Sequence, residues 1–247
     1  MPRFHPFMDE NKKPQLFDHI SPENLEKILS CSVIQEHDAN KVLLNQGDTP
    51  PGIFLILEGS VKTLRMNADG EEATIRLLGV NDTCLEAVLF MGGPSPITVQ
   101  TIGKSRLLLI PERVVKTRVL EDNEFAVNLL RIVTRHYKNA MHQIDAMHIK
   151  SPLQRVGYYF LTKHLEAGHE NFELKLPFKK QIIANYLGMT PETFSRVLKQ
   201  LKELGVDTDD NTIRLKDAYA LCHFCDADTT ALCQRHDKSS CQVCISH

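Results

Sequence analysis

The spacing of apolar residues changes along the chain, and the first pattern covers residues 31–110. Short apolar runs there are separated by turn-forming stretches such as Asn67–Glu72 and Gly92-Gly93-Pro94. Short strands punctuated in this way are typical of an antiparallel, barrel-like roll. Upstream, the dipeptide Ser21-Pro22 is a common start of a short helix, with serine as the N-cap. Residues 1–110 therefore predict a β-roll domain with an N-terminal helix.

A helical period follows the roll, and from Ala126 onward apolar residues recur at alternating steps of four and three. This spacing is the narrow seam of a coiled coil, and it differs from the wider face of a helix that packs in a core. We expect a dimerisation helix in residues 111–150 that pairs with its copy in a second chain. The alternative is a helix that lies against its own roll. The expected interface residues after Ala126 are Leu130, Val133, Tyr137, Ala140, Ile144 and Met147.

Residues 151–221 predict a winged helix-turn-helix. Two segments with helical period meet at Gly188-Met189, and the second begins with Thr190-Pro191 and stops at Gly205. Threonine is a favourable N-cap, proline fits the first turn and glycine ends helices. Residues 206–215 then have the pattern of a hairpin-like wing. The second helix of the pair is expected to bury Phe194, Val197, Leu198, Leu201 and Leu204.

The opposite stripe of this second helix carries side chains suited to DNA. A Glu carboxylate accepts from cytosine N4, an Arg guanidinium binds guanine O6 and N7, and a Ser hydroxyl serves a base or a phosphate. Lysines beside them neutralise phosphates. A solvated polar face of an ordinary helix has the same residue types, so the stripe alone does not identify a DNA-binding helix. The candidate DNA contacts are Glu192, Ser195, Arg196, Lys199, Thr190 and Lys180.

Composition excludes several classes of protein. With 247 residues, 42% hydrophobic and 24% charged, the chain is neither disordered nor fibrous. Its apolar runs are too short to cross a bilayer, and its N-terminus lacks the apolar core of a secretory signal. We therefore expect a cytoplasmic protein with no membrane partner. No Ser/His/Asp set, paired carboxylates or phosphate loop is visible, so we expect no enzyme.

The order of a β-roll, a long helix and a winged helix-turn-helix resembles the CRP/FNR family of bacterial transcription regulators. The segment LGMTPETFSRVLKQLKELG, residues 187–205, is similar to the family's recognition segment. The resemblance implies an α+β fold with an N-terminal antiparallel, cyclic-nucleotide-binding-like roll. It places Glu192, Ser195 and Arg196 where the FNR branch reads a TTGAT half-site. The implied partners are double-stranded DNA with a promoter palindrome, a second copy of the chain, and RNA polymerase.

The roll departs from the family's cAMP-binding members. Glu86 matches the glutamate of their phosphate cassette, but Pro96 and Ile97 stand where arginine and serine are expected. We therefore expect no cAMP binding. Residues 85–96 are instead similar to the DNR-like, nitric oxide-responsive branch, which is linked to haem. A haem iron needs an axial His, Cys or Met, but each residue of this kind here is more typical of a solvent-facing histidine or a core cysteine. The candidates, none of which we assign, are His19, Cys84, His136, His142 and His148.

Five of the seven cysteines lie in the tail, residues 222–247. The tail has too few apolar side chains to fold without a stabilising cross-link such as a bound metal or a disulfide. Two Cys-x2-Cys pairs separated by fifteen residues fit the spacing of a zinc site. A fifth cysteine exceeds what zinc requires, so an iron–sulfur cluster stays open as the other candidate cofactor. A disordered tail with incidental thiols, or a disulfide switch, is the remaining alternative. The candidate ligands are Cys222, Cys225, Cys233, Cys241 and Cys244.

Together these features predict a homodimeric, sequence-specific transcription regulator that reads a TTGAT/ATCAA palindrome under a redox, oxygen or nitric oxide signal. One alternative is a cyclic-nucleotide-type roll that acts as a regulatory module without DNA. The missing cassette arginine and the intact recognition stripe both disfavour it. Another is a redox enzyme that uses the Cys-x2-Cys pairs, but such chemistry is usually placed near a βαβ unit, which the sequence lacks.

Overall fold

The computed structural model describes residues 13–167, 172–176, 178–209, 211–217 and 219–226. The chain forms two compact units, Met1–Ala140 and Met141–His247. Both units contain helices and antiparallel strands, so the predicted α+β fold class is confirmed. Within the described ranges, no helix combines the length and the apolar content that a membrane crossing needs.

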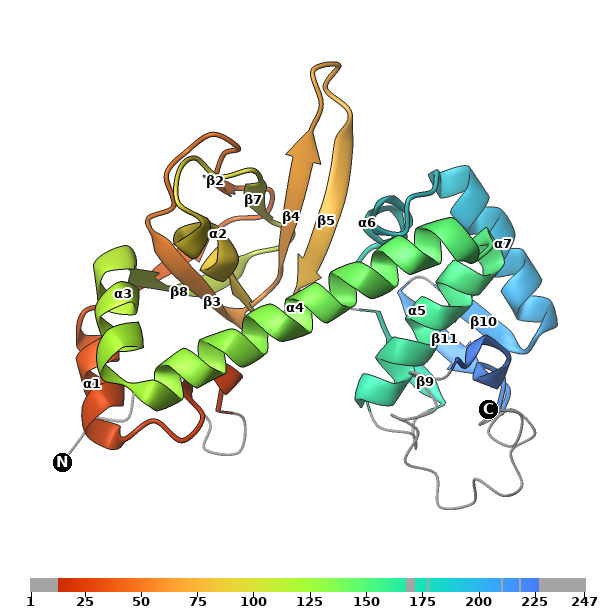
Figure 1. The fold of residues 1–247 in the computed structure, drawn as a ribbon. Helices are drawn as coiled ribbons and strands as arrows, with labels where there is room; N and C mark the ends of the chain where they lie inside the picture. The colour runs from red at the N-terminus through yellow and green to blue at the C-terminus, as the bar shows by residue number, and fades with distance from the viewer. Residues whose placement is uncertain (1–12, 168–171, 177, 210, 218, 227–247) are drawn as a thin grey trace. The chain divides into compact units, whose positions relative to one another are not determined.

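The first unit contains the predicted roll, built from two four-stranded antiparallel sheets (Figure 1). Their strand orders are β1-β8-β3-β6 and β2-β7-β4-β5. The predicted hairpin turn joins β4 to β5, where the Asn67 side chain accepts a hydrogen bond from the Glu71 backbone at 2.8 Å. The strands are β1 Val33–His37, β2 Val42–Leu44, β3 Gly52–Glu58, β4 Val61–Met66, β5 Glu72–Leu78, β6 Thr83–Cys84, β7 Thr98–Thr101 and β8 Ser105–Pro111.

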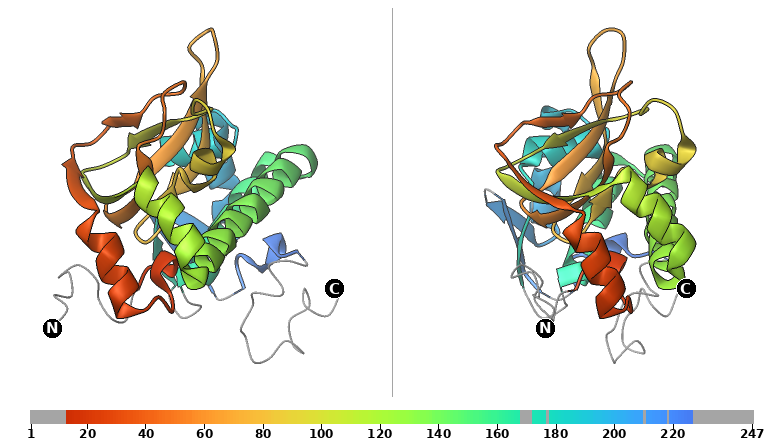
Figure 2. Two further views of the ribbon diagram at one scale, coloured as in Figure 1. Left: turned by 60° about the vertical axis from the view of Figure 1, so that its left-hand side comes forward. Right: turned by 90° about the vertical axis from the view of Figure 1, so that its left-hand side faces the viewer.

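The roll has two apolar clusters because alternate residues of its strands face opposite sides. One cluster includes Phe54 and Val99 and draws on strands of both sheets. The other includes Ile53 and Leu108 and packs against helices. Two further views show α1, α3 and the first half of α4 gathered together (Figure 2). The helical segments of this unit are η2 Gln15–Phe17, α1 Pro22–Ser30, α2 Glu86–Met91, α3 Glu112–Glu121 and the greater part of α4 Asn123–Ile149.

The range 111–150, expected as one dimerisation helix, holds two helices. Asp122 stands between α3 and α4, and its carboxylate accepts a hydrogen bond from Phe125 N at 3.1 Å. A side chain that accepts from the first turn in this way is an N-cap, so α4 starts as a new helix. Asp122 also accepts from Asn24 Nδ2 at 2.7 Å. This bond fixes the start of α4 to α1.

The second unit contains the last turns of α4 and the predicted winged helix-turn-helix. Its three strands form one antiparallel sheet in the order β10-β11-β9. The wing predicted for residues 206–215 is the β10–β11 hairpin, with Val206 paired to Leu215. The elements are α5 Pro152–Ala167, β9 Glu173–Lys175, α6 Lys180–Tyr186, α7 Pro191–Glu203, β10 Val206–Asp209, β11 Thr212–Leu215 and η3 Cys222–Phe224.

Candidate functional site

Helices α6 and α7 form the helix-turn-helix that the sequence predicts. Gly188 lies in the turn with a φ of +64°, a left-handed conformation that glycine adopts without strain. Thr190 caps α7, because its Oγ1 accepts from Thr193 N at 3.2 Å. Phe194, Val197 and Leu201 bury one face of α7. Two further residues of the expected apolar stripe are less covered: Leu198 is half-buried and Leu204, just beyond the helix, is 39% exposed.

The opposite face of α7 is exposed and carries four of the predicted DNA contacts, Glu192, Ser195, Arg196 and Lys199. Because these residues occupy i, i+3, i+4 and i+7, they lie along one stripe of the helix. Among the described residues, neither Arg196 nor Lys199 is held in an ion pair. Arg196 Nη2 donates only a neutral hydrogen bond, 3.3 Å from Thr193 Oγ1. Both cations are therefore available to an anionic partner.

The first turn of α7 also sets the charge state of Glu192. Hydrogen bonds from its own backbone N–H and from the Thr190 hydroxyl hold the pKa of the Glu192 carboxyl below its usual range. An ionised carboxylate accepts hydrogen bonds, which suits a cytosine amino group. The two remaining candidates differ in position. Thr190 is exposed but is used as the cap, and Lys180 is half-buried at the start of α6.

Helix α4 has two apolar stripes instead of one. Phe125, Leu129 and Ile132 are buried in the cluster beneath the roll. The first turns of α4 therefore lie against the roll, but they do so through residues other than the predicted seam. The seam residues form a different stripe, in which Leu130 is 65% and Tyr137 is 66% exposed. Of the other seam residues, Ala126 and Val133 are half-buried, and Ala140, Ile144 and Met147 are exposed.

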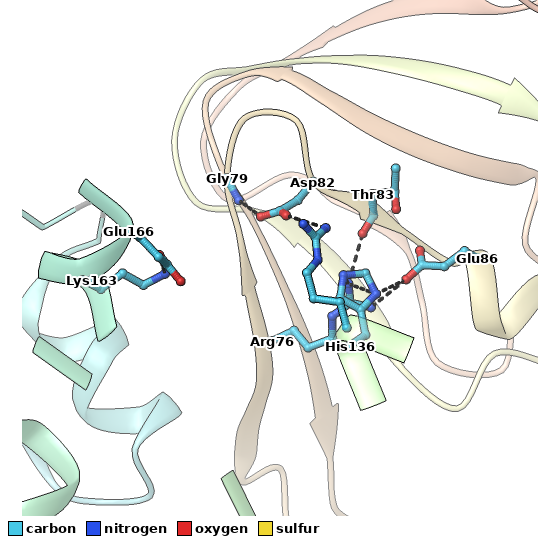
Figure 3. A network of polar contacts seen from close by, with 9 residues as sticks. Arg76, Gly79, Asp82, Thr83, Glu86, His136, Lys163 and Glu166 are labelled. Atoms are coloured by element: carbon cyan, nitrogen blue, oxygen red, sulfur yellow. Dashed lines mark hydrogen bonds and ion pairs between the residues drawn. The ribbon is translucent and has the colours of Figure 1, made fainter. Parts of the chain in front are cut away.

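Glu86, the residue that matches the nucleotide-binding glutamate, is 1% exposed and lies inside a charged network (Figure 3). Arg76 Nη1 lies 3.2 Å from its Oε1, and His136 Nδ1 lies 2.5 Å from the same oxygen. Arg76 Nη2 also lies 2.8 Å from His136 Nε2 and 3.1 Å from the Thr83 carbonyl oxygen. Three elements, α2, β5 and α4, are thus joined at one buried carboxylate.

The network keeps Glu86 ionised. Burial by itself raises the pKa of a carboxyl group, but the hydrogen bond from His136 and the charge of Arg76 outweigh it, so the pKa of Glu86 lies below its usual range. Within the described residues, Glu86 Oε2 is buried and has no hydrogen-bond partner. The carboxylate that the sequence resemblance places in a nucleotide-binding cassette here binds two side chains of its own chain.

The candidate haem ligands lie in dissimilar surroundings. His136 is engaged by Glu86 and Arg76. Cys84 is fully buried, and this burial, followed by the nearby Glu86 charge, raises the pKa of its thiol well above the usual range. His19 and His148 are exposed and His142 is half-buried. The structure assigns no haem ligand among them.

The two cysteines of the tail that fall in described residues are Cys222 and Cys225, at either end of a single 3-10 turn. Both are half-buried and neither is in a disulfide. Over the described part of the chain, no three His, Cys, Asp or Glu side chains are grouped as metal ligands. The other three predicted ligands, Cys233, Cys241 and Cys244, lie outside the described residues.

Sequence reasoning missed the partners of its own candidate residues. Arg76 lies in a strand that alternates apolar and polar residues, and nothing in that pattern links it to Glu86. His136 was singled out only as a haem candidate. Their meeting depends on long-range packing, since Arg76 and His136 are 60 residues apart.

Two family models match the chain. The model described as a cyclic nucleotide-binding domain matches residues 34–122, on the roll. The model described as a Crp-like helix-turn-helix domain matches residues 154–224, in the second unit. Together the matched ranges span more than half of the chain.

Similar proteins of known role are transcription regulators, not enzymes. The chain is 25% identical over 195 residues to the cyclic AMP receptor protein of Thermus thermophilus, covering 79% of this chain and 88% of that protein. It is 24% identical over 193 residues to the transcriptional activator protein FnrA of Stutzerimonas stutzeri, covering 74% and 76%. Among solved structures, FixK2 from Bradyrhizobium japonicum shares the fold, with a TM-score of 0.69 at 20% identity over 79% of this chain and 98% of that one.

Proposed function

Because this chain belongs to the CRP/FNR family of DNA-binding transcription regulators, we propose that it reads a TTGAT-N4-ATCAA palindrome as a homodimer. The observation that carries the proposal is the exposed face of α7. There an ionised Glu192 and an Arg196 that forms no ion pair within the described residues lie one turn apart on a capped helix. A carboxylate and a guanidinium so placed are suited to the cytosine and the guanine of a G·C pair.

The dimer is supported by the second stripe of α4. Large apolar side chains such as Leu130 and Tyr137 are rarely left exposed in a row, and a symmetric partner helix would cover them. Pairing of α4 with its copy gives the protein a twofold axis. Two-fold related recognition helices in this class bind half-sites about one DNA turn apart, roughly 34 Å. A palindrome with a short spacer meets that requirement.

The signal, in this proposal, is redox, oxygen or nitric oxide and not cAMP. Two observations argue against a cyclic nucleotide. Pro96 and Ile97 leave the cassette without a cation for the phosphate, and Glu86 is already bound by Arg76 and His136. The thiols of Cys222 and Cys225 supply the chemistry for a redox signal, as zinc or iron–sulfur ligands together with the other tail cysteines. RNA polymerase is the further partner that a promoter-binding regulator would engage.

DNA binding by wild type and two matched variants tests the proposal. Fluorescence anisotropy would compare a duplex carrying TTGAT-N4-ATCAA with one in which each half-site guanine is replaced. Arg196→Ala should cost about 1–3 kcal/mol on the first duplex and remove the preference between the two. Lys199→Ala, a phosphate contact on the same stripe, should weaken both duplexes alike. An Arg196→Ala protein that keeps the wild-type preference would show that α7 docks in another way.

A further inference from the structure

The residues after the wing form a short ordered segment, 219–226, which we call the anchor segment. It contains the turn η3, in which Cys225 N donates a hydrogen bond to Cys222 O at 3.1 Å. Ala220, Leu221 and Phe224 are all buried. The two thiols are therefore carried on a segment that is packed into the second unit (Figure 1).

The anchor segment packs on α5 and lies close to Gly205, beyond the end of α7. A Cβ atom on Gly205, the second residue after α7, would lie 3.8 Å from Ala220 Cβ. On α5, the Phe224 ring occupies the space that a side chain at Gly157 would need, since a Cβ there would approach the ring to 2.3 Å. The absence of a side chain at Gly157 thus leaves the space in which the Phe224 ring packs.

The segment also binds the residue that follows α4. Lys150, the residue that follows α4, forms a salt bridge with Asp226, in which Lys150 Nζ donates a hydrogen bond to Asp226 Oδ2 at 2.7 Å. The same ammonium group lies 4.1 Å from the centre of the Tyr158 ring. Both partners of the ion pair are partly buried, with 22% and 33% of their side chains exposed. One short segment thus contacts α5 and the residue that follows α4, and it lies close to Gly205, just beyond α7.

We propose that, when they carry no metal, Cys222 and Cys225 act as a regulatory dithiol whose oxidation to a disulfide loosens this anchor and weakens DNA binding. The proposal rests on the DNA-binding function proposed above. The oxidant is a low-molecular-weight disulfide. One thiol loses its proton and attacks a sulfur of that disulfide, which releases one thiolate. The second thiol attacks the mixed disulfide and releases the other thiolate. Two protons leave the protein, and the oxidant is reduced to two thiols.

The local geometry permits the bond and explains its effect. The ends of a hydrogen-bonded turn lie less than about 7 Å apart at Cα, within reach of the roughly 4.4–6.8 Å that disulfides span. In the reduced state, Cys225 Sγ–H donates to the Asp226 carbonyl oxygen at 3.7 Å. A disulfide sulfur has no hydrogen, so this bond is lost and Cys225 turns toward Cys222. Asp226, the next residue, is then displaced from Lys150.

The test uses the full chain with Cys31, Cys233, Cys241 and Cys244 replaced by serine, after chelator treatment. Only the anchor thiols and the buried Cys84 remain. Glutathione disulfide oxidises the protein, and peptide mass spectrometry locates the bond by the loss of two hydrogens. Anisotropy with the TTGAT-N4-ATCAA duplex then compares the two states. We expect the Kd of the oxidised protein to rise about two- to fivefold, the size expected for loss of one partly exposed ion pair.

Two variants that replace a carboxylate by an amide distinguish loss of the Lys150–Asp226 ion pair from loss of any negative charge in the second unit. Asp226→Asn should raise the Kd in the reduced state by the same factor, and oxidation should then add nothing. Glu166→Gln breaks another 2.7 Å ion pair, with Lys163 on α5, and should leave the Kd unchanged. A disulfide that forms without changing the Kd, or a pair that glutathione disulfide does not oxidise, would overturn the inference. Reduced protein that does not prefer the palindrome over a scrambled duplex would instead overturn the proposed function.

Discussion

Replacement of Arg76 by methionine should destabilise the roll far more than loss of an ordinary surface ion pair. Methionine keeps most of the aliphatic length but leaves Glu86, at 1% exposure, with His136 as its remaining side-chain partner among the described residues. Removal of one partner from a buried charge costs about 3–5 kcal/mol. Because 24% of the Arg76 side chain is exposed, we expect the lower end of that range, about 3 kcal/mol.

Arg106→Met is the matched control. Arg106 Nη2 pairs with Glu58 at 2.9 Å on the same roll, and the arginine is similarly exposed at 30%, but its partner is 63% exposed. An exposed carboxylate keeps its hydration when the cation is removed, so this variant should lose only about 0–1 kcal/mol. The comparison therefore isolates the burial of the carboxylate from the loss of an arginine.

Urea unfolding followed by circular dichroism measures both variants, since the chain has no tryptophan to report by fluorescence. Hydrogen exchange on peptides of α2 and β5 confirms that the change lies in the roll. The pH dependence adds a second check. Because the pKa of Glu86 is lowered in the folded state, its stabilisation is present above the unfolded-state pKa and is lost as the pH falls through the folded-state pKa. Without Arg76 that pKa rises, so acid unfolding should begin at a higher pH. Equal losses of stability in the two variants would refute the reasoning.

Three other predictions concern the dimer, the ligand and the tail. Tyr137→Asp places a charge in the seam and should convert a dimer to monomers in light scattering, whereas the same change at exposed Lys138 should not. Titration calorimetry should detect no micromolar binding of cAMP, and binding that alters DNA affinity would contradict the proposed role of Pro96 and Ile97. Metal analysis of anaerobically prepared protein should find metal bound to the wild type and none bound to a Cys222→Ser, Cys225→Ser double variant. Equal, near-zero metal contents in both would contradict the proposed metal site.

The sequence by itself determined the elements that depend on local chemistry. The Thr190 cap, the turn at Gly188 and the wing are set by residues a few positions apart, and the structure has all three. The hairpin turn that starts at Asn67 was equally local. The exposed stripe of α7, which is proposed to face DNA, followed from helical period alone, because a buried Phe194 and Val197 leave the opposite face exposed.

Tertiary structure decided the contacts between distant segments. Helical period predicted one apolar seam on α4. The second apolar stripe, which includes Phe125 and packs against the roll, is recognised only from the folded structure. The ion pair between Arg76 and Glu86 and the bond between Lys150 and Asp226 join residues on different elements. Neither propensity nor period encodes such pairs, because their energy depends on desolvation and distance in the folded chain.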